Sequence, residues 1–211
     1  ASRYGHESPV EIRQITNDGM RKGASIVSDG TRIYFPAIKA GTTLLGQVPV
    51  AGGETWTSPV FADGAPFELL DASRDGRELL LSSVGRLWVV TPGNGAAVRP
   101  VADVRSNLAR WSPDELSIAF VPYDDATVLR LVTAAGVGEH GLAKFSAPIA
   151  EVQWSLDGTL LRVAVPEIAG GPKRFYDISP RDPRPLPVLK RWNHEAGSGT
   201  WIGKHRFVFA S

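Results

Sequence analysis

The sequence predicts an all-β protein made of repeated four-stranded units, and two observations support this prediction. First, a turn motif of the form Ser-x-Asp-Gly recurs along the chain at intervals of 39 to 46 residues. Second, the segments between the motifs are short apolar or alternating runs bounded by Gly, Pro, Asn or Asp, a pattern typical of strands and tight turns. Four-stranded units repeated at this period predict a β-propeller, in which each repeat forms one blade.

The turn motif occurs in four recognisable copies and one eroded copy. The aspartates of the four copies are Asp29, Asp75, Asp114 and Asp157, and the eroded copy is the segment Trp201–Phe209. Aspartate accepts hydrogen bonds from its own backbone and glycine adopts a positive φ, so each motif is interpreted as the turn between the first two strands of a blade. In the third copy Glu115 replaces the glycine, and we expect a distorted turn there. The four aspartates lie in separate blades and cannot share a calcium ion.

Each unit is expected to contain strands A, B, C and D in chain order. Strand A precedes the turn motif, as in 108–112 and 151–155, and strand B follows it, as in 118–121 and 160–165. Strand C is the next apolar run, and its four examples are 43–50, 86–91, 128–133 and 174–178. A glycine-rich turn then leads to strand D.

Strand A carries two rows of residues that alternate along it. Trp111, Trp154 and Trp201 share one register, and we expect them to pack between blades. The residue before each tryptophan, and the residue at the same position of the second unit, form a second row, which we call the polar row. Its members are Asp71, Arg110, Gln153 and Thr200. The polar row is a candidate lining of a central channel. The alternative is that these side chains only fill the channel, paired with one another or solvated by water, and bind no ligand.

The chain contains four complete blades and a partial fifth that both termini are expected to form. In this interpretation, residues 1–211 are a single propeller domain, and Val10–Thr16 closes the ring against Arg206–Ala210. The alternative is that the segment is a fragment of a longer propeller with further blades after Ser211. We expect that the segment is such a fragment, and that its ring either closes or pairs edge to edge in this form. Self-association through open edge strands is a further prediction.

Composition excludes several classes of protein. Hydrophobic residues make up 43% of the chain and charged residues 21%, as in ordinary globular domains. The net charge of +1 gives no signal for direct binding of nucleic acid, and no apolar run approaches the roughly 18 residues of a membrane span. The absence of cysteine excludes disulfides and thiolate metal sites. A cytoplasmic location is favoured, with the periplasm as the alternative.

The repeat resembles a known family. The phrases Trp111-Ser-Pro-Asp114, Ile118-Ala-Phe120 and Trp154-Ser-Leu-Asp-Gly158 resemble the TolB-type, WD-repeat-like β-propeller repeat of bacterial proteins. The phrases Gln14–Gly19, Ser28–Phe35 and Gln47–Glu54 resemble the C-terminal propeller of bacterial winged-helix transcriptional regulators. That second resemblance implies a sensory or protein-interaction role, with any DNA binding located outside this segment.

No catalytic, metal-binding or cofactor-binding motif is found, so we expect a protein that is not an enzyme and holds no cofactor. The segment Ala196–Thr200 has the wrong spacing for a nucleophile elbow, and no glycine-rich phosphate loop is present. His194, Glu195 and His205 do not have the spacing of a known metal site. The rival hypothesis is an accessory propeller of a prolyl-oligopeptidase-like hydrolase, or an enzyme that uses the polar row.

A binding site is expected where the B–C loops, such as 36–41, and the D–A loops, such as 102–107, emerge beside the channel mouth. Loops on a rigid scaffold carry most binding residues. We call this end the loop face, and the opposite end, with the A–B and C–D turns, the turn end. The partner is expected to be a protein, a peptide or a small ligand. The candidate binding residues of the polar row and the loop face are Asp71, Arg110, Gln153, Tyr123, Asp124, Lys173, Trp192 and His194.

Overall fold

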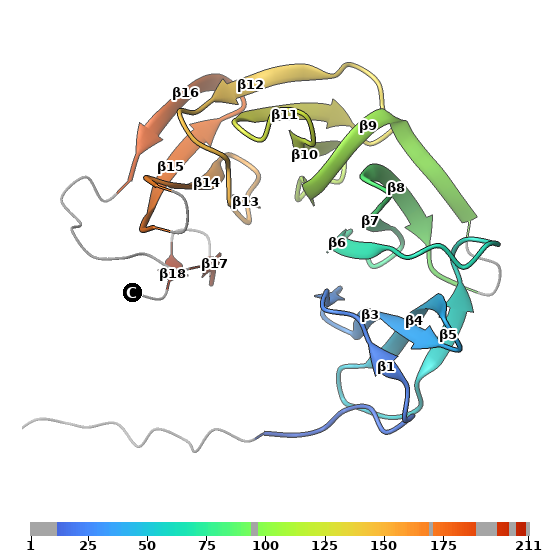
Figure 1. Cartoon of the computed structure of the whole chain (residues 1–211). Coiled ribbons are helices and arrows are strands. Elements are labelled where there is room, and N and C mark those ends of the chain that lie inside the picture. Colours follow the sequence, from blue (N-terminus) through green and yellow to red (C-terminus); the bar gives the residue numbers. More distant parts are fainter. Residues whose placement is uncertain (1–11, 94–96, 169–170, 189–197, 203–205, 210–211) are drawn as a thin grey trace, which may run out of the picture.

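The computed structural model describes residues 12–93, 97–168, 171–188, 198–202 and 206–209, and the regular structure in these segments is all β-strand. Antiparallel sheets follow one another around an arc, with the first strand of each unit near the centre and the last outside (Figure 1). The described residues contain no helix that could cross a membrane. The prediction of an all-β propeller of four-stranded blades is confirmed.

Four blades follow in chain order, and a two-stranded hairpin follows the fourth (Figure 1). Blade 1 contains β1 (Arg21–Lys22), β2 (Val27–Ser28), β3 (Arg32–Lys39), β4 (Thr42–Pro49) and β5 (Trp56–Pro59). Blades 2 and 3 contain β6 (Glu68–Ala72), β7 (Leu79–Ser83), β8 (Arg86–Thr91), β9 (Ala97–Trp111), β10 (Ser117–Pro122), β11 (Val128–Thr133) and β12 (His140–Lys144). Blade 4 and the hairpin contain β13 (Glu151–Trp154), β14 (Leu161–Pro166), β15 (Lys173–Ser179), β16 (Asp182–Pro187), β17 (Gly199–Trp201) and β18 (Phe207–Phe209).

The β9 strand belongs to two blades, which the sequence analysis did not predict. Its first part pairs with β8 as the outer strand of blade 2, and its second part pairs with β10 as the inner strand of blade 3. Residues 102–107 were expected to be a loop, but the strand runs through them with a register shift between its pairings with Arg86 and Trp88. Likewise Pro36–Lys39, expected in a loop, extends β3, and only Ala40 and Gly41 form the turn to β4.

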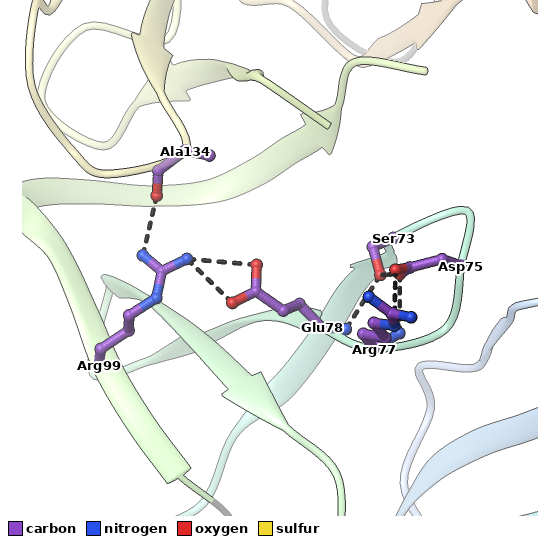
Figure 2. Close-up of polar contacts among 6 residues, drawn as sticks. All are labelled: Ser73, Asp75, Arg77, Glu78, Arg99 and Ala134. Carbon is purple, nitrogen blue, oxygen red and sulfur yellow. Dashed lines mark hydrogen bonds and ion pairs between the residues drawn. The ribbon is translucent and has the colours of Figure 1, made fainter. Parts of the chain in front are cut away.

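The recurring motif forms the A–B turn of each blade, as predicted. In blade 2 the Asp75 carboxylate accepts hydrogen bonds from the Ser73 hydroxyl at 2.8 Å and the Arg77 N–H at 2.9 Å (Figure 2). Gly76 has a φ of 69°. In the third copy Glu115 adopts a φ of 62°, so the turn keeps its shape where a distortion was expected. The Glu115 carboxylate also accepts a hydrogen bond from the Asp75 N–H at 3.0 Å, which joins the turns of blades 2 and 3.

An arginine connects the same two blades at the turn end. The Arg99 guanidinium on β9 forms an ion pair with Glu78 at 3.1 Å and donates a hydrogen bond to the Ala134 carbonyl at 2.8 Å (Figure 2). Glu78 precedes β7 in blade 2, whereas Ala134 follows β11 in blade 3. The turns at this end are therefore held by contacts between blades as well as within them.

The hydrophobic core lies between neighbouring blades. One cluster joins Leu80, Leu87 and Val89 of blade 2 to Trp111 and Phe120 of blade 3. An equivalent cluster joins blades 3 and 4, and Trp154 packs against it. The prediction that these tryptophans pack between blades is confirmed for both residues, and truncating such a side chain removes about 3 to 5 kcal/mol of stability in typical cores.

Within the part of the chain that the structure describes, the ring does not close through the expected terminal strand. Residues 12–16, the described part of that segment, form no strand, and β18 pairs with β17 alone among the described residues. Instead the Arg13 guanidinium donates to the Ala51 carbonyl at 2.7 Å, and Ile15 packs near Phe35 on the face of blade 1. The arc is open between the hairpin and β1 (Figure 1). At residues 12–16 the structure therefore shows apolar packing of Ile15 on blade 1, where pairing with the C-terminal strand was expected.

Candidate functional site

The polar row lies along the inner strands, where it joins neighbouring blades. The Asp71 carboxylate on β6 accepts a hydrogen bond from the Trp111 N–H of blade 3 at 2.8 Å. In return, the Arg110 guanidinium of blade 3 donates to the Leu70 carbonyl of blade 2 at 2.7 Å. The structure therefore brings together two of the predicted residues, Asp71 and Arg110, in a reciprocal contact between blades.

The row continues into blade 4 and the hairpin. The Trp154 indole N–H donates to the Arg110 carbonyl at 3.4 Å. The Gln153 side-chain amide donates to the Gly199 carbonyl at the start of β17. Each inner strand from β6 onward thus contacts the next through a member of the polar row or the tryptophan beside it, and these side chains have a structural role whether or not a ligand binds.

The environment of Asp71 disfavours its charged form. Burial raises the pKa of the Asp71 carboxyl, while the nearby Arg110 guanidinium and the N–H groups of Trp111 and Ala72 oppose that rise. A carboxylate without these partners would be costly at this depth.

The polar row opens toward the turn end, not toward the loop face. A hollow of about 400 Å³, the turn-end hollow, has Asp71, Arg110 and Gln153 in its wall. The other lining residues include Arg74, Pro113 and Leu156 of the A–B turns, Thr200, and Trp111 and Trp154. Because residues of the polar row lie only a few positions before the A–B turns, their side chains reach the end of the ring that carries those turns.

The remaining candidates belong to the loop face and are dispersed over it. Tyr123 is 61% exposed and lies against Gly85, the turn of the preceding blade, with a ring atom 3.7 Å from the position of a Cβ there. Asp124 is exposed beside it. Lys173 begins β15 and forms an ion pair with Glu151, which also accepts a hydrogen bond from the Ser198 hydroxyl at 2.6 Å. Trp192 and His194 lie outside the described residues.

A strained turn stands on the loop face between blades 2 and 3. Val84 and Gly85 join β7 to β8 with φ values of 52° and 73°, the conformation of a two-residue type I′ turn. A β-branched residue is unfavourable at positive φ, yet Val84 is 83% exposed. It borders two hollows of about 410 and 610 Å³. Backbone strain of this kind gathers at functional positions.

Sequence reasoning missed three residues that the structure brings to these sites. Val84 replaces the asparagine or aspartate usual in such a turn, and its place before Gly85 between two apolar runs was a readable signal. Arg74 occupies the variable position of the turn motif, and its location at the turn-end hollow follows from the register of strand A. Glu151 gave no signal, since its pairing with Lys173 depends on the three-dimensional arrangement of blade 4.

The described residues contain no group of three or more His, Asp or Glu side chains placed to hold a metal ion. The features that the structure offers for recognition are therefore hollows, exposed apolar side chains and arginines.

Comparisons with known proteins agree with this architecture. No protein-family model matches the chain, and no curated protein matches its sequence. Among solved structures, it is similar to a chain of a nidogen–laminin complex, with a TM-score of 0.65 and 14% identity over 88% of this chain and 70% of that chain. A putative TolB from Agrobacterium tumefaciens matches with a TM-score of 0.65 and 13% identity over 79% of this chain and 64% of that chain. A prolyl endopeptidase matches with a TM-score of 0.63 and 14% identity over 90% of this chain and 32% of that chain.

These matches place the chain among the β-propeller proteins and support the TolB-like fold. At such low identity they show the fold alone, because unrelated functions occupy the same fold. The chain spans 70% or less of each of these neighbours, and about a third of the prolyl endopeptidase.

Proposed function

We propose that this segment is a non-enzymatic propeller module that binds a protein, a peptide or a small ligand, and that its loop face is a docking surface. The observation that carries the proposal is a series of exposed apolar residues at the B–C connections. Val84, Tyr123 and Ile168, from three successive blades, are 83%, 61% and 69% exposed. Exposed aromatic and aliphatic side chains on a rigid scaffold provide apolar area that association with another molecule can bury.

The face also has a polar surround suited to specific recognition. Asp124 and Arg105 are exposed, and neither side chain forms a hydrogen bond or ion pair with another described residue. Interfaces commonly combine an apolar centre containing aromatic residues with a charged rim. Two of the structural neighbours come from protein complexes, nidogen with laminin and the mitotic checkpoint complex, which supports an interaction role for the fold.

The finer proposal is that the module is the sensory part of a bacterial transcriptional regulator, whose DNA-binding domain lies outside this segment. It rests on the resemblance of 14–19, 28–35 and 47–54 to such propellers. The second candidate is an accessory propeller of a hydrolase, which the similarity to a prolyl endopeptidase over 90% of this chain favours. The sequence encoded next to this segment distinguishes the two candidates. A winged-helix domain there supports the regulator, and a hydrolase domain there supports the accessory propeller.

Photocrosslinking from two positions of blade 3 tests the docking surface. Tyr123 and Val137 have nearly equal exposure, 61% and 63%, but lie on the loop face and at the turn end respectively. A photoreactive residue at position 123 is expected to crosslink a partner in extracts of the native cell, and Tyr123→Ser should reduce its binding while Val137→Ser leaves it unchanged. Equal crosslinking from both positions, or none from position 123, would show that the loop face is not the docking surface.

A further inference from the structure

The turn-end hollow contains an arginine that is fixed in place but only partly used. The Arg110 Nη1 atom donates to the Leu70 carbonyl at 2.7 Å and to the Ala109 carbonyl at 2.8 Å. Its Nε and Nη2 atoms form no hydrogen bond with any other described residue. These two atoms make one edge of the guanidinium, and two parallel donors on one edge match the two oxygens of a carboxylate.

The surrounding charges favour an anion. Arg74, in the A–B turn of blade 2, is exposed at the rim, and within the described segments its side chain has no ion-pair partner. Of the described residues in the wall of this hollow, Asp71 alone is acidic, and two backbone N–H groups already occupy its oxygens. Burial raises the pKa of Asp71, while Arg110 and the two N–H groups oppose that rise. Among the described residues, two arginines therefore border the hollow together with a single carboxyl group.

Part of the remaining wall is apolar, and Ser112, Gln153 and Thr200 add polar groups to it. Trp154 lines the hollow together with Pro113 and the half-exposed Leu156. A volume of about 400 Å³ is within the range of small-molecule sites. An aromatic wall beside an arginine edge suits a ligand that has a carboxylate at one end and a flat apolar group at the other.

We propose that the turn-end hollow binds a carboxylate attached to an aromatic or similar flat apolar group, with Arg110 as the bidentate partner and Trp154 as the stacking surface. This inference deepens the ligand-binding half of the proposed function and rests on it. It concerns the end of the ring opposite the loop face, so crosslinking from position 123 and the experiment below succeed or fail separately.

A carboxylate of this kind has two sources, a free organic acid and the C-terminus of a peptide. Calorimetry with phenylacetate and with acetyl-Ala-Phe, each compared with its amide, distinguishes them. We expect at least one acid to bind about tenfold more tightly than its amide, because charge-assisted hydrogen bonds to arginine require the carboxylate. Preference for phenylacetate identifies a free acid, and preference for the dipeptide identifies a peptide terminus.

Three variants and a control complete the test. Arg110→Gln should weaken binding of the preferred acid about tenfold, and Arg74→Ala should weaken it by a smaller factor. Asp71→Asn keeps an oxygen for the Trp111 N–H but removes the negative charge, so binding should tighten. Arg181→Gln, at an exposed arginine in the β15–β16 turn, should change nothing. The proposal is overturned if neither acid binds better than its amide, or if Arg74→Ala and Asp71→Asn, with unfolding midpoints like the wild type, leave the affinity unchanged.

Discussion

The Asp71 carboxylate of blade 2 accepts a hydrogen bond from the Trp111 backbone N–H of blade 3 at 2.8 Å. A side chain of one inner strand thus satisfies the main chain of the next. Such a contact does not belong to the strand pairing of either blade, and it links the two inner strands directly.

Removing the Asp71 carboxyl should destabilise the protein more than neutralising it. Asp71→Ala leaves the Trp111 N–H without its partner, and we expect a loss of about 2 kcal/mol in the free energy of unfolding. Asp71→Asn retains an acceptor oxygen and should cost less than about 1 kcal/mol. Urea unfolding at pH 7 measures both changes. Equal losses for the two variants would contradict a role for the hydrogen bond.

Arg162→Lys should loosen the β17–β18 hairpin. The Arg162 guanidinium pairs with Asp177 through two hydrogen bonds of 2.8 and 2.7 Å, and it lies 4.4 Å from the centre of the Trp201 ring. Lysine cannot form the planar fork, so we expect a loss of about 1 to 2 kcal/mol in the free energy of unfolding.

Arg184→Lys is the matched control for this change. Arg184 makes the same two-bonded pair with Asp182, at 2.9 and 2.7 Å, but the two side chains are 81% and 57% exposed rather than 12% and 19% for Arg162 and Asp177. Exposed pairs contribute little, so the control should cost less than about 0.5 kcal/mol. Amide exchange in 199–201 and 207–209 should accelerate in the first variant alone; no difference between the variants would refute the assignment.

Val84→Asn should stabilise the protein by about 1 kcal/mol. Asparagine tolerates the φ of 52° that Val84 adopts before Gly85, whereas a branched side chain is strained there. Val137→Asn, at a valine 63% exposed and without a positive φ, should be neutral. Thermal unfolding of both variants gives the answer, and a gain at position 137 equal to that at position 84 would mean that the strain is not the cause.

Gly46→Ala should be costly, because an added Cβ at β4 would lie 2.4 Å from the Phe35 ring. Phe35 is buried against Ala37 and Val48, so it has little room to move. We expect a loss of about 2 kcal/mol in the free energy of unfolding. Gly141→Ala, at a strand glycine with open space around it, should have no cost. If chemical denaturation gives the same result for both glycines, close packing of Phe35 on β4 is wrong.

Stability should fall as the pH drops from about 4 to about 2. Burial opposes ionisation of Asp29, but hydrogen bonds from Arg32, Thr31 and Tyr34 outweigh it and lower its pKa to about 2. The Ser155 hydroxyl and the Thr159 N–H and hydroxyl lower the pKa of Asp157 to about 2 as well. Folded-state values below those of the unfolded chain mean that the stabilisation is present above pH 4 and lost as each group is protonated.

The Asp29 contribution to this acid loss can be isolated by substitution. Asp29→Asn removes the titration, so its unfolding free energy should depend less on pH between about 4 and 2, by about 1 kcal/mol after allowing for solvent screening. Urea midpoints at a series of pH values test this. An acid dependence as steep as that of the wild type would show that Asp29 does not contribute.

The sequence predicted the blades well because their turns depend on local chemistry. Asp75 and Gly76 form their turn largely by themselves, and Trp111 follows from strand alternation. The course of β9 through 102–107 was not predictable, since it depends on contacts distant along the chain. The Ser106 N–H donates to the Gly85 carbonyl in the β7–β8 turn, and Ser106 pairs with Pro122 of β10. The sequence also did not show that Arg110 borders a hollow at the turn end, because this depends on the position of residue 110 relative to neighbouring turns.

The sharing of β9 between two blades has a mechanical consequence. One strand of 15 residues supplies the outer edge of blade 2 and the inner edge of blade 3, so blade 3 cannot be detached without disturbing the backbone ladder of blade 2. In most repeat arrays, neighbouring units are coupled chiefly by side-chain packing across an interface. We therefore expect blades 2 and 3 to behave as a single stiff segment, so that bending of the open arc under load would concentrate at the junctions on either side of it.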